Sequence, residues 1–160
     1  MKYVLLCLLL AATPAARAQS SEVPAPFKGA NIILVHTTDS TGVAVRTMAR
    51  ALLQAGLEPD RYDAQVGYLT TKGKLFGMIL PAVYVYKVLA TTEPGGTLLT
   101  ITGEFTQQLA PMHSITSPMF WTPGNPEGKR CFALVEPVAQ AYPKGRVGYL
   151  QSLALKPVMH

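Results

Sequence analysis

The amino-acid sequence predicts an α+β fold, a two-layer sandwich in which two helices cover one face of an antiparallel sheet. Several short segments alternate between apolar and polar residues, which is typical of strands. Two longer segments repeat their apolar residues every three or four positions, which is typical of amphipathic helices. The predicted order is β-α-β-β-β-α, and Arg146–Leu150 can add a final strand. This arrangement buries both apolar helical stripes against the sheet.

The first predicted strand and helix are adjacent in the chain. Ala30–His36 is a short apolar run rich in β-branched residues, which favours a strand. From Ser40 to Leu57 apolar residues recur at helical spacing, so this segment is predicted to be an amphipathic helix. Gly56 fits the C-terminal cap of that helix, and Pro59 lies beyond its end.

Three strands are predicted in the middle of the chain, at Arg61–Thr71, Ala82–Thr92 and Thr97–Phe105. The second is apolar on nearly both faces, which suits a central strand. The turn-forming residues Glu93–Gly96 predict that the last two strands form a hairpin. The connection from Thr71 to Pro81 is predicted to be a loop, although it contains the apolar sequence LFGMIL.

The last third of the chain contains the second predicted helix. Gln107–Gly124 has three prolines and no clear periodicity, so it is predicted to be irregular. Asn125 is the expected N-cap, with Pro126 at the first helical position, where a missing N–H costs little. Pro137 is expected to kink this helix or to end it early.

The N-terminus predicts export. Lys2, the apolar stretch Tyr3–Ala12 and the A-x-A sequence Ala16–Ala18 together have the form of a secretory signal peptide. The predicted organisation is a signal peptide at residues 1–18, a flexible leader at 19–28, one α+β domain at 29–151 and a tail at 152–160. The expected location is periplasmic or secreted.

Composition excludes several classes of protein. Without the signal peptide the chain has 12 basic and 9 acidic side chains, a net charge of +3 that is spread along the sequence. A nucleic-acid-binding protein would show a clustered basic face, so no nucleic-acid partner is expected. After the signal no segment has 18 consecutive apolar residues, so no transmembrane segment is expected there. Cys131 is the one remaining cysteine, and a small buried side chain on a helix is favoured over a free reactive or intermolecular thiol.

The order of elements behind an export signal resembles the small helix-grip or TATA-binding-protein-like domains of bacterial envelope proteins. These include the outer-membrane assembly lipoproteins and several uncharacterised periplasmic families. The resemblance covers about residues 29–150 and rests on element order and exported context. It implies a protein-interaction or assembly module without catalytic residues. The lipid-attachment cysteine of the lipoprotein members is missing, because Cys7 lies inside the apolar stretch after Leu6.

The segment HTTDSTG places His36, Asp39 and Ser40 within five positions. A serine hydrolase needs a nucleophile, a base and an orienting acid that converge in space, and no G-x-S-x-G elbow surrounds Ser40. We interpret the segment as the start of the helix, with Asp39, Ser40 or Thr41 capping a free N–H group. An anion bound at the same N–H groups is a second, weaker interpretation.

Other chemical motifs are incomplete. GNPEGK at residues 124–129 lacks the spacing and the Ser or Thr of a phosphate-binding loop. The three histidines are far apart in sequence, and there is no C-x-x-C, so no metal site is expected. Nothing marks Glu104 and Glu127 as a glycosidase pair. The sequence therefore indicates no catalytic residue, no metal ligand and no cofactor.

Two apolar stretches outside the predicted elements form the one candidate binding patch. Its members are Leu75, Phe76, Met78, Met119, Phe120 and Trp121. If both stretches meet at one end of the sheet, they line an apolar groove for a peptide or a lipid-like ligand. The favoured interpretation is that these side chains close the edge of a small core, because apolar side chains are usually buried.

The sequence thus predicts an exported, non-catalytic protein that binds another envelope protein. The alternative is a binding protein for a small apolar or lipid-like ligand. A hydrolase that uses Ser40 or Ser114 with a histidine is the least favoured class.

Overall fold

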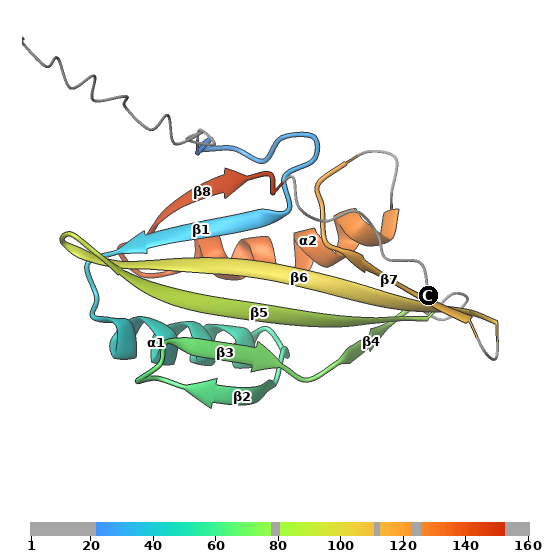
Figure 1. The fold of residues 1–160 in the computed structure, drawn as a ribbon, viewed down its shortest axis with the longest axis horizontal. Helices are drawn as coiled ribbons and strands as arrows, with labels where there is room; N and C mark the ends of the chain where they lie inside the picture. The colour runs from blue at the N-terminus through green and yellow to red at the C-terminus, as the bar shows by residue number, and fades with distance from the viewer. Residues whose placement is uncertain (1–21, 78–80, 111–112, 123–125, 153–160) are drawn as a thin grey trace, which may run out of the picture.

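The computed structural model describes residues 22–77, 81–110, 113–122 and 126–152. It confirms the predicted fold class, because an antiparallel sheet is packed against two helices (Figure 1). The strands are β1 (Ile32–Thr37), β2 (Pro59–Asp63), β3 (Tyr68–Thr71), β4 (Lys74–Phe76), β5 (Ala82–Glu93), β6 (Gly96–Ala110), β7 (His113–Pro118) and β8 (Arg146–Leu150). The helices are α1 (Thr41–Gln54) and α2 (Pro126–Gln140).

A long hairpin forms the centre of the sheet. Strand β5 pairs over its full length with residues Gly96–Gln107 of β6 around the turn Pro94–Gly95, so the predicted hairpin is confirmed. The strand order is β2-β3-β5-β6-β1-β8, while β4 adds to β5 and β7 adds to β6. Strand β8 pairs with β1, which confirms the predicted final strand. The four strands β4, β5, β6 and β7 therefore lie together at one end of the sheet (Figure 1).

Helix α1 ends where the sequence predicts. Gly56 has a φ of +72°, and its N–H donates to the carbonyl of Leu53, while the N–H of Leu57 donates to the carbonyl of Leu52. These two bonds form a Schellman cap, in which glycine adopts the left-handed conformation. Leu52 and Leu57 are both buried, which adds the apolar contact that usually accompanies this cap.

Tyrosine hydroxyl groups connect α2 to the sheet. On β5, Tyr84 donates to the carboxylate of Glu127 at 2.5 Å and Tyr86 donates to the carbonyl of Cys131 at 2.8 Å. On β8, Tyr149 donates to the carboxylate of Glu136 at 3.0 Å. All three rings are buried in the core, so each hydroxyl has a partner where water is excluded.

The predicted single strand at Arg61–Thr71 is wrong, because this segment is a hairpin of β2 and β3. The carboxylate of Asp63 accepts hydrogen bonds from the N–H groups of Gln65 and Val66, which forms an Asx turn. Gly67 completes the turn with a φ of +80°. The alternation used for the prediction placed Val66 on a buried face, whereas Val66 is 70% exposed at the turn.

The predicted loops at Thr71–Pro81 and Gln107–Gly124 each contain a strand. Strand β4 lies in the first, and β6 extends to Ala110 and continues into β7 in the second. Strand β7 is exposed along most of its length, so its residues show no apolar alternation that a sequence analysis can recognise.

Helix α2 begins at Pro126, as predicted, while its expected N-cap Asn125 lies outside the described residues. The helix continues through Pro137 to Gln140, so the prediction of an early end is wrong. Pro137 removes the N–H that would bond to the carbonyl of Ala133. Both residues are on the exposed side of the helix, where water can bind that carbonyl.

Candidate functional site

The structure separates the three residues of HTTDSTG that resemble a catalytic cluster. The Nδ1 atom of His36 lies 3.1 Å from the carboxylate of Glu93, and its Nε2 atom lies 2.9 Å from the carboxylate of Glu22. Each ring nitrogen of His36 therefore contacts a carboxylate, and neither nitrogen is directed at the Ser40 hydroxyl. Ser114 is on β7, at the opposite end of the sheet from His36.

The position of the helix cap is as predicted, but its chemistry differs. Ser40 occupies the N-cap position with an extended backbone, and its side chain makes no capping hydrogen bond. The carboxylate of Asp39 instead accepts a hydrogen bond from the hydroxyl of Tyr142 at 2.9 Å. Burial, and then this bond to Asp39, raise the pKa of Tyr142 to about 12. Asp39 therefore connects the start of α1 to the chain that follows α2.

Asp39→Ala is expected to lower the free energy of unfolding by about 1–3 kcal/mol, because it leaves the buried Tyr142 hydroxyl without its acceptor. Ser40→Ala is the matched control and is expected to change it by less than about 0.5 kcal/mol. Urea unfolding followed by circular dichroism measures both values. A larger loss for Ser40→Ala would show that the serine caps the helix after all.

The predicted apolar patch divides between the two faces of the sheet. Leu75 pairs with Val83 on the face without helices and is 64% exposed. Phe76, the next residue, points to the helical side, where its ring stacks on that of Tyr84 at a centroid distance of 4.9 Å. Met78 lies outside the described residues.

The second half of the patch lies on and around the core. Met119 is completely buried, and its sulfur lies 2.9 Å from the position that a Cβ at Gly103 would take. Phe120 is half-buried against Gly128, in the first turn of α2. Trp121 pairs with Ala30 and is half-buried, with its ring close to the Nζ atom of Lys129. Met119 therefore packs inside the molecule, and Phe120 and Trp121 cover the core beside α2.

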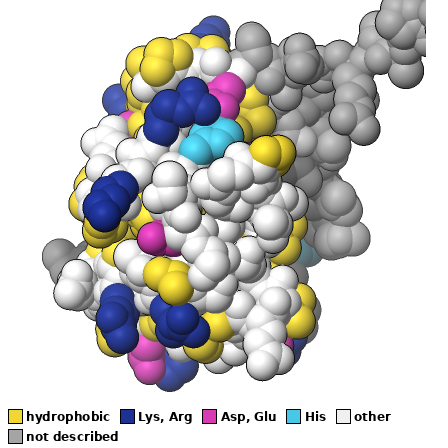
Figure 2. Space-filling model, turned by 90° about the vertical axis from the view of Figure 1, so that its left-hand side faces the viewer, with side chains coloured by type: hydrophobic (Ala, Val, Ile, Leu, Met, Phe, Trp, Pro, Cys, Tyr) yellow, Lys and Arg dark blue, Asp and Glu magenta, His cyan; other side chains and the backbone are white. Residues whose placement is uncertain are grey.

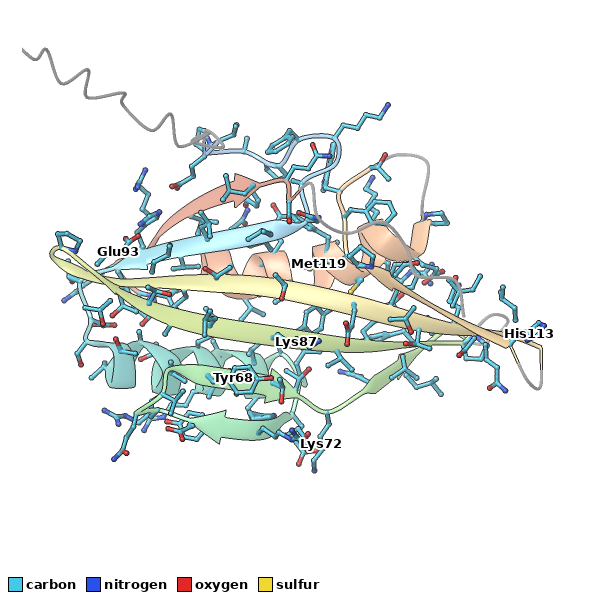
Figure 3. The ribbon with its side chains drawn as sticks, in the orientation of Figure 1. Tyr68, Lys72, Lys87, Glu93, His113 and Met119 are labelled. Atoms are coloured by element: carbon cyan, nitrogen blue, oxygen red, sulfur yellow. The ribbon has the colours of Figure 1, made fainter. Side chains whose placement is uncertain are left out.

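A different set of exposed apolar side chains lies at one end of the sheet, on both of its faces, and we call this end the strand-end surface. Leu75 and Val83 lie on the face without helices, whereas Ile115 pairs with Gln107 and shares the face of Phe76. Its members come from four neighbouring strands and are Leu75, Val83, Leu109 and Ile115, which are 64%, 37%, 56% and 37% exposed. Here the four strands run past helix α2 (Figure 1), and Figure 3 places His113 at this end, opposite Glu93. Leu75 is the one member that the sequence predicts as part of a binding patch; Val83 lies on a strand predicted to be central, and Leu109 and Ile115 lie in a segment predicted to be a loop.

A shallow groove of about 390 Å³ lies on the strand-end surface. Its apolar residues are Leu75, Pro81 and Val83, and its polar ones include Thr106, Gln108 and Ser114. A second groove of about 460 Å³ runs between the two helices and is lined mostly by alanine and proline, with Arg50 and Gln54 among its polar residues. Both grooves are open to solvent, unlike the enclosed pockets in which most small ligands bind.

Several kinds of chemistry have no site in the part of the chain that the structure describes. Cys131 is completely buried, and burial raises its pKa to about 12, so its thiol is not a nucleophile at neutral pH. No three histidine, cysteine or acidic residues among the described ones are grouped so that they can hold a metal ion. No described helix has the length and apolar character needed to cross a bilayer.

Comparison of the chain with protein-family models, with curated proteins and with solved structures finds no match.

Proposed function

We propose that the protein is an exported, non-catalytic interaction module that binds an envelope protein through the strand-end surface. The observation that carries this proposal is the exposed cross-strand pair of Leu75 on β4 and Val83 on β5, on the face without helices. Exposed apolar side chains that lie together on a folded protein mark interaction surfaces, whereas single ones are ordinary. The signal-like N-terminus supports export to the periplasm or beyond the cell.

The edge of the sheet at β7 supports the same proposal. Exposed edge strands usually carry charged residues that discourage pairing with another chain. Strand β2, at one edge, has Asp60, Arg61 and Asp63, whereas β7 contains no lysine, arginine, aspartate or glutamate. An extended segment of a partner can therefore add to β7 while its apolar side chains contact Ile115.

A small apolar or lipid-like ligand is the second candidate. The groove beside Leu75 and Val83 favours it, because its volume of about 390 Å³ lies within the range of small-ligand sites. The groove is lined by both apolar and polar side chains, so a ligand with an apolar chain and a polar head group fits it best. This ligand would use the same end of the sheet as a protein partner.

Site-specific photo-crosslinking tests the proposal. A photoreactive residue at Leu75 or Ile115 is expected to give one crosslinked protein band in cells of the source organism. Leu53 on α1 is the matched control, because it is a similarly exposed leucine, 56%, away from the strand-end surface. Equal crosslinking from Leu53 and Leu75 would contradict the proposal. Lipid crosslinked at Leu75, detected by mass spectrometry, would support the second candidate instead.

A further inference from the structure

A third groove, of about 410 Å³, lies on the face of the sheet that carries no helices. It lies over β2, β3 and β5, and it shares no residue with the groove on the strand-end surface. Three of the residues that line it are basic, namely Arg61, Lys72 and Lys87. Figure 3 shows Lys72 and Lys87 on this face together with Tyr68, which also lines the groove. The groove is therefore a polar, basic feature, distinct from the apolar surface proposed for a protein partner.

Strand pairing places two of these basic residues on either side of Thr70. Arg61 on β2 pairs with Thr70 on β3, and Thr70 pairs in turn with Lys87 on β5. Paired residues of neighbouring strands share one face, and two strand spacings separate Arg61 from Lys87 by about 10 Å. Both long side chains can therefore reach a group that is bound above Thr70. The three positions are far apart in sequence, so the cluster does not appear as a run of basic residues.

The hydroxyl of Thr70 is available to a ligand. Thr70 is only 6% exposed, and its hydroxyl forms no hydrogen bond with any residue that the structure describes. In that part of the chain no fully enclosed side-chain oxygen or nitrogen is without a partner, so the Thr70 hydroxyl opens onto the groove that the residue lines. Hydroxyl groups in such buried positions are usually hydrogen-bonded. A free hydroxyl on the floor of the groove thus marks a position where an oxygen of a ligand can bind.

The carboxylates around the groove leave two of its basic side chains available to a ligand. Lys72 donates to Glu58 at 2.7 Å, and this hydrogen bond raises the pKa of Lys72. Lys87 lies 3.2 Å from Glu104, but the two side chains are 48% and 41% exposed, so water weakens their attraction. Arg61 has no ion pair with any residue that the structure describes. Lys72 is therefore already paired, whereas Arg61 and Lys87 can turn to an anion.

Charges at the end of the molecule where β5 turns into β6 are more evenly mixed. Figure 2 looks onto that end and shows lysine and arginine side chains interspersed with acidic side chains and a histidine. There the carboxylate of Glu22 lies 2.9 Å from His36 and 3.7 Å from Arg146. The groove beside Thr70 instead has three basic residues and, among the described residues that line it, one acidic residue, Asp60.

We propose that this groove binds a phosphate monoester, with the phosphate above Thr70 and between Arg61 and Lys87. The two basic side chains donate charge-assisted hydrogen bonds from opposite sides, and the Thr70 hydroxyl donates from the floor. A tetrahedral phosphate has oxygens directed toward all three donors, whereas a carboxylate has two oxygens in a single plane. The groove is large enough for a sugar-sized organic group beside the ring of Tyr68. This site does not depend on the partner proposed for the strand-end surface.

Isothermal titration calorimetry of the protein with glucose 6-phosphate tests the site, at low ionic strength where charges are least screened. The ester is expected to bind, and glucose, which lacks the phosphate, is expected not to bind. Co-sedimentation with phosphatidylcholine vesicles that contain phosphatidic acid presents the same phosphate group on a lipid. Binding to the vesicles alone would assign the groove to a lipid head group. Binding to neither phosphate probe, or equal binding of glucose, would overturn the proposal.

Three variants separate this groove from the general attraction of a basic protein for anions. Arg61→Gln is expected to weaken binding of the phosphate probe about tenfold, because it removes a charge-assisted hydrogen bond. Arg46→Gln is the matched control, since it removes the same charge from an exposed arginine on α1, outside the groove. It is expected to change the affinity by less than about twofold. Asp60→Asn removes the acidic side chain from the lining and is expected to strengthen binding about threefold.

Two results with these variants would overturn the proposal. One is an equal loss of affinity in Arg61→Gln and Arg46→Gln, which would show that only the net charge of the protein matters. The other is unchanged or weaker binding in Asp60→Asn, which would place the anion away from the groove.

Discussion

Met119→Ala is expected to lower the free energy of unfolding by about 2–5 kcal/mol, the usual range for truncation of a buried methionine. Met119 is completely buried, and its sulfur packs beside Gly103 and close to the ring of Tyr86. Truncation removes these contacts and leaves a cavity that rigid strands on either side cannot fill. Urea unfolding followed by circular dichroism and by Trp121 fluorescence measures the loss.

Leu75→Ala is the matched control for Met119→Ala. Leu75 belongs to the same predicted patch, but it is 64% exposed, so its truncation is expected to change the free energy of unfolding by less than about 0.5 kcal/mol. The difference between the two losses of stability thus shows which residue of the predicted patch lies in the core and which lies on the surface. Similar losses for both would show that Met119 is not in the core.

Gly96→Ala is expected to lower the free energy of unfolding by about 3 kcal/mol, through overpacking. A Cβ at Gly96 would overlap with the backbone carbonyl oxygen of Thr37, at the end of β1. Backbone atoms cannot move aside as a side chain can, so the pairing of β1 with β6 must shift. The β5–β6 hairpin is the centre of the sheet, and the disturbance is therefore expected to reach both layers.

Gly95→Ala separates this steric effect from backbone strain. No atom lies within 4 Å of a Cβ at Gly95, but the φ of this residue is +91°, which is unfavourable for alanine. We expect a loss of about 1–2 kcal/mol from strain alone. Chemical denaturation of the two variants side by side checks the order, and a larger loss for Gly95→Ala would refute the overlap at Gly96.

Much of the fold follows from local sequence signals. The helix α1 was predictable because its apolar spacing and Gly56 agree on where it lies and where it ends. The β5–β6 hairpin was predictable because Pro94 and Gly95 are turn residues between two apolar strands. In each case periodicity and turn chemistry point to the same structure.

Other elements depend on partners that a local pattern does not show. Strand β7 forms because β6 offers a pairing edge, and its own exposed residues give no alternation. The turn between β2 and β3 depends on Asp63, whose Asx turn interrupts what appears in sequence as one alternating strand. In both cases hydrogen bonding outweighs the apolar pattern.

The candidate sites were less predictable than the fold. Leu75 and Met119 look alike in sequence, as apolar residues between glycines and prolines, and only the packing separates them. His36 meets Glu22 and Glu93 across 14 and 57 positions of sequence, so no motif spacing joins them. HTTDSTG correctly predicts the start of α1, whereas nothing in it indicates the two carboxylates that contact its histidine.

The tyrosine hydroxyls on the sheet have a consequence for how uniquely α2 is positioned. Side chains that meet only through apolar contacts tolerate a helix that slides along its axis by a turn of about 5.4 Å. The three hydrogen bonds between the sheet and α2 can form together in only one axial position of the helix. They join Tyr84 to Glu127, Tyr86 to the Cys131 carbonyl, and Tyr149 to Glu136. Any slip would leave the buried tyrosine hydroxyls without these partners, at a cost of about 1–3 kcal/mol for each. The three hydrogen bonds thus fix α2 in a single position on the sheet, where apolar contacts alone would allow several. This matters because Pro137 already removes one hydrogen bond within the helix.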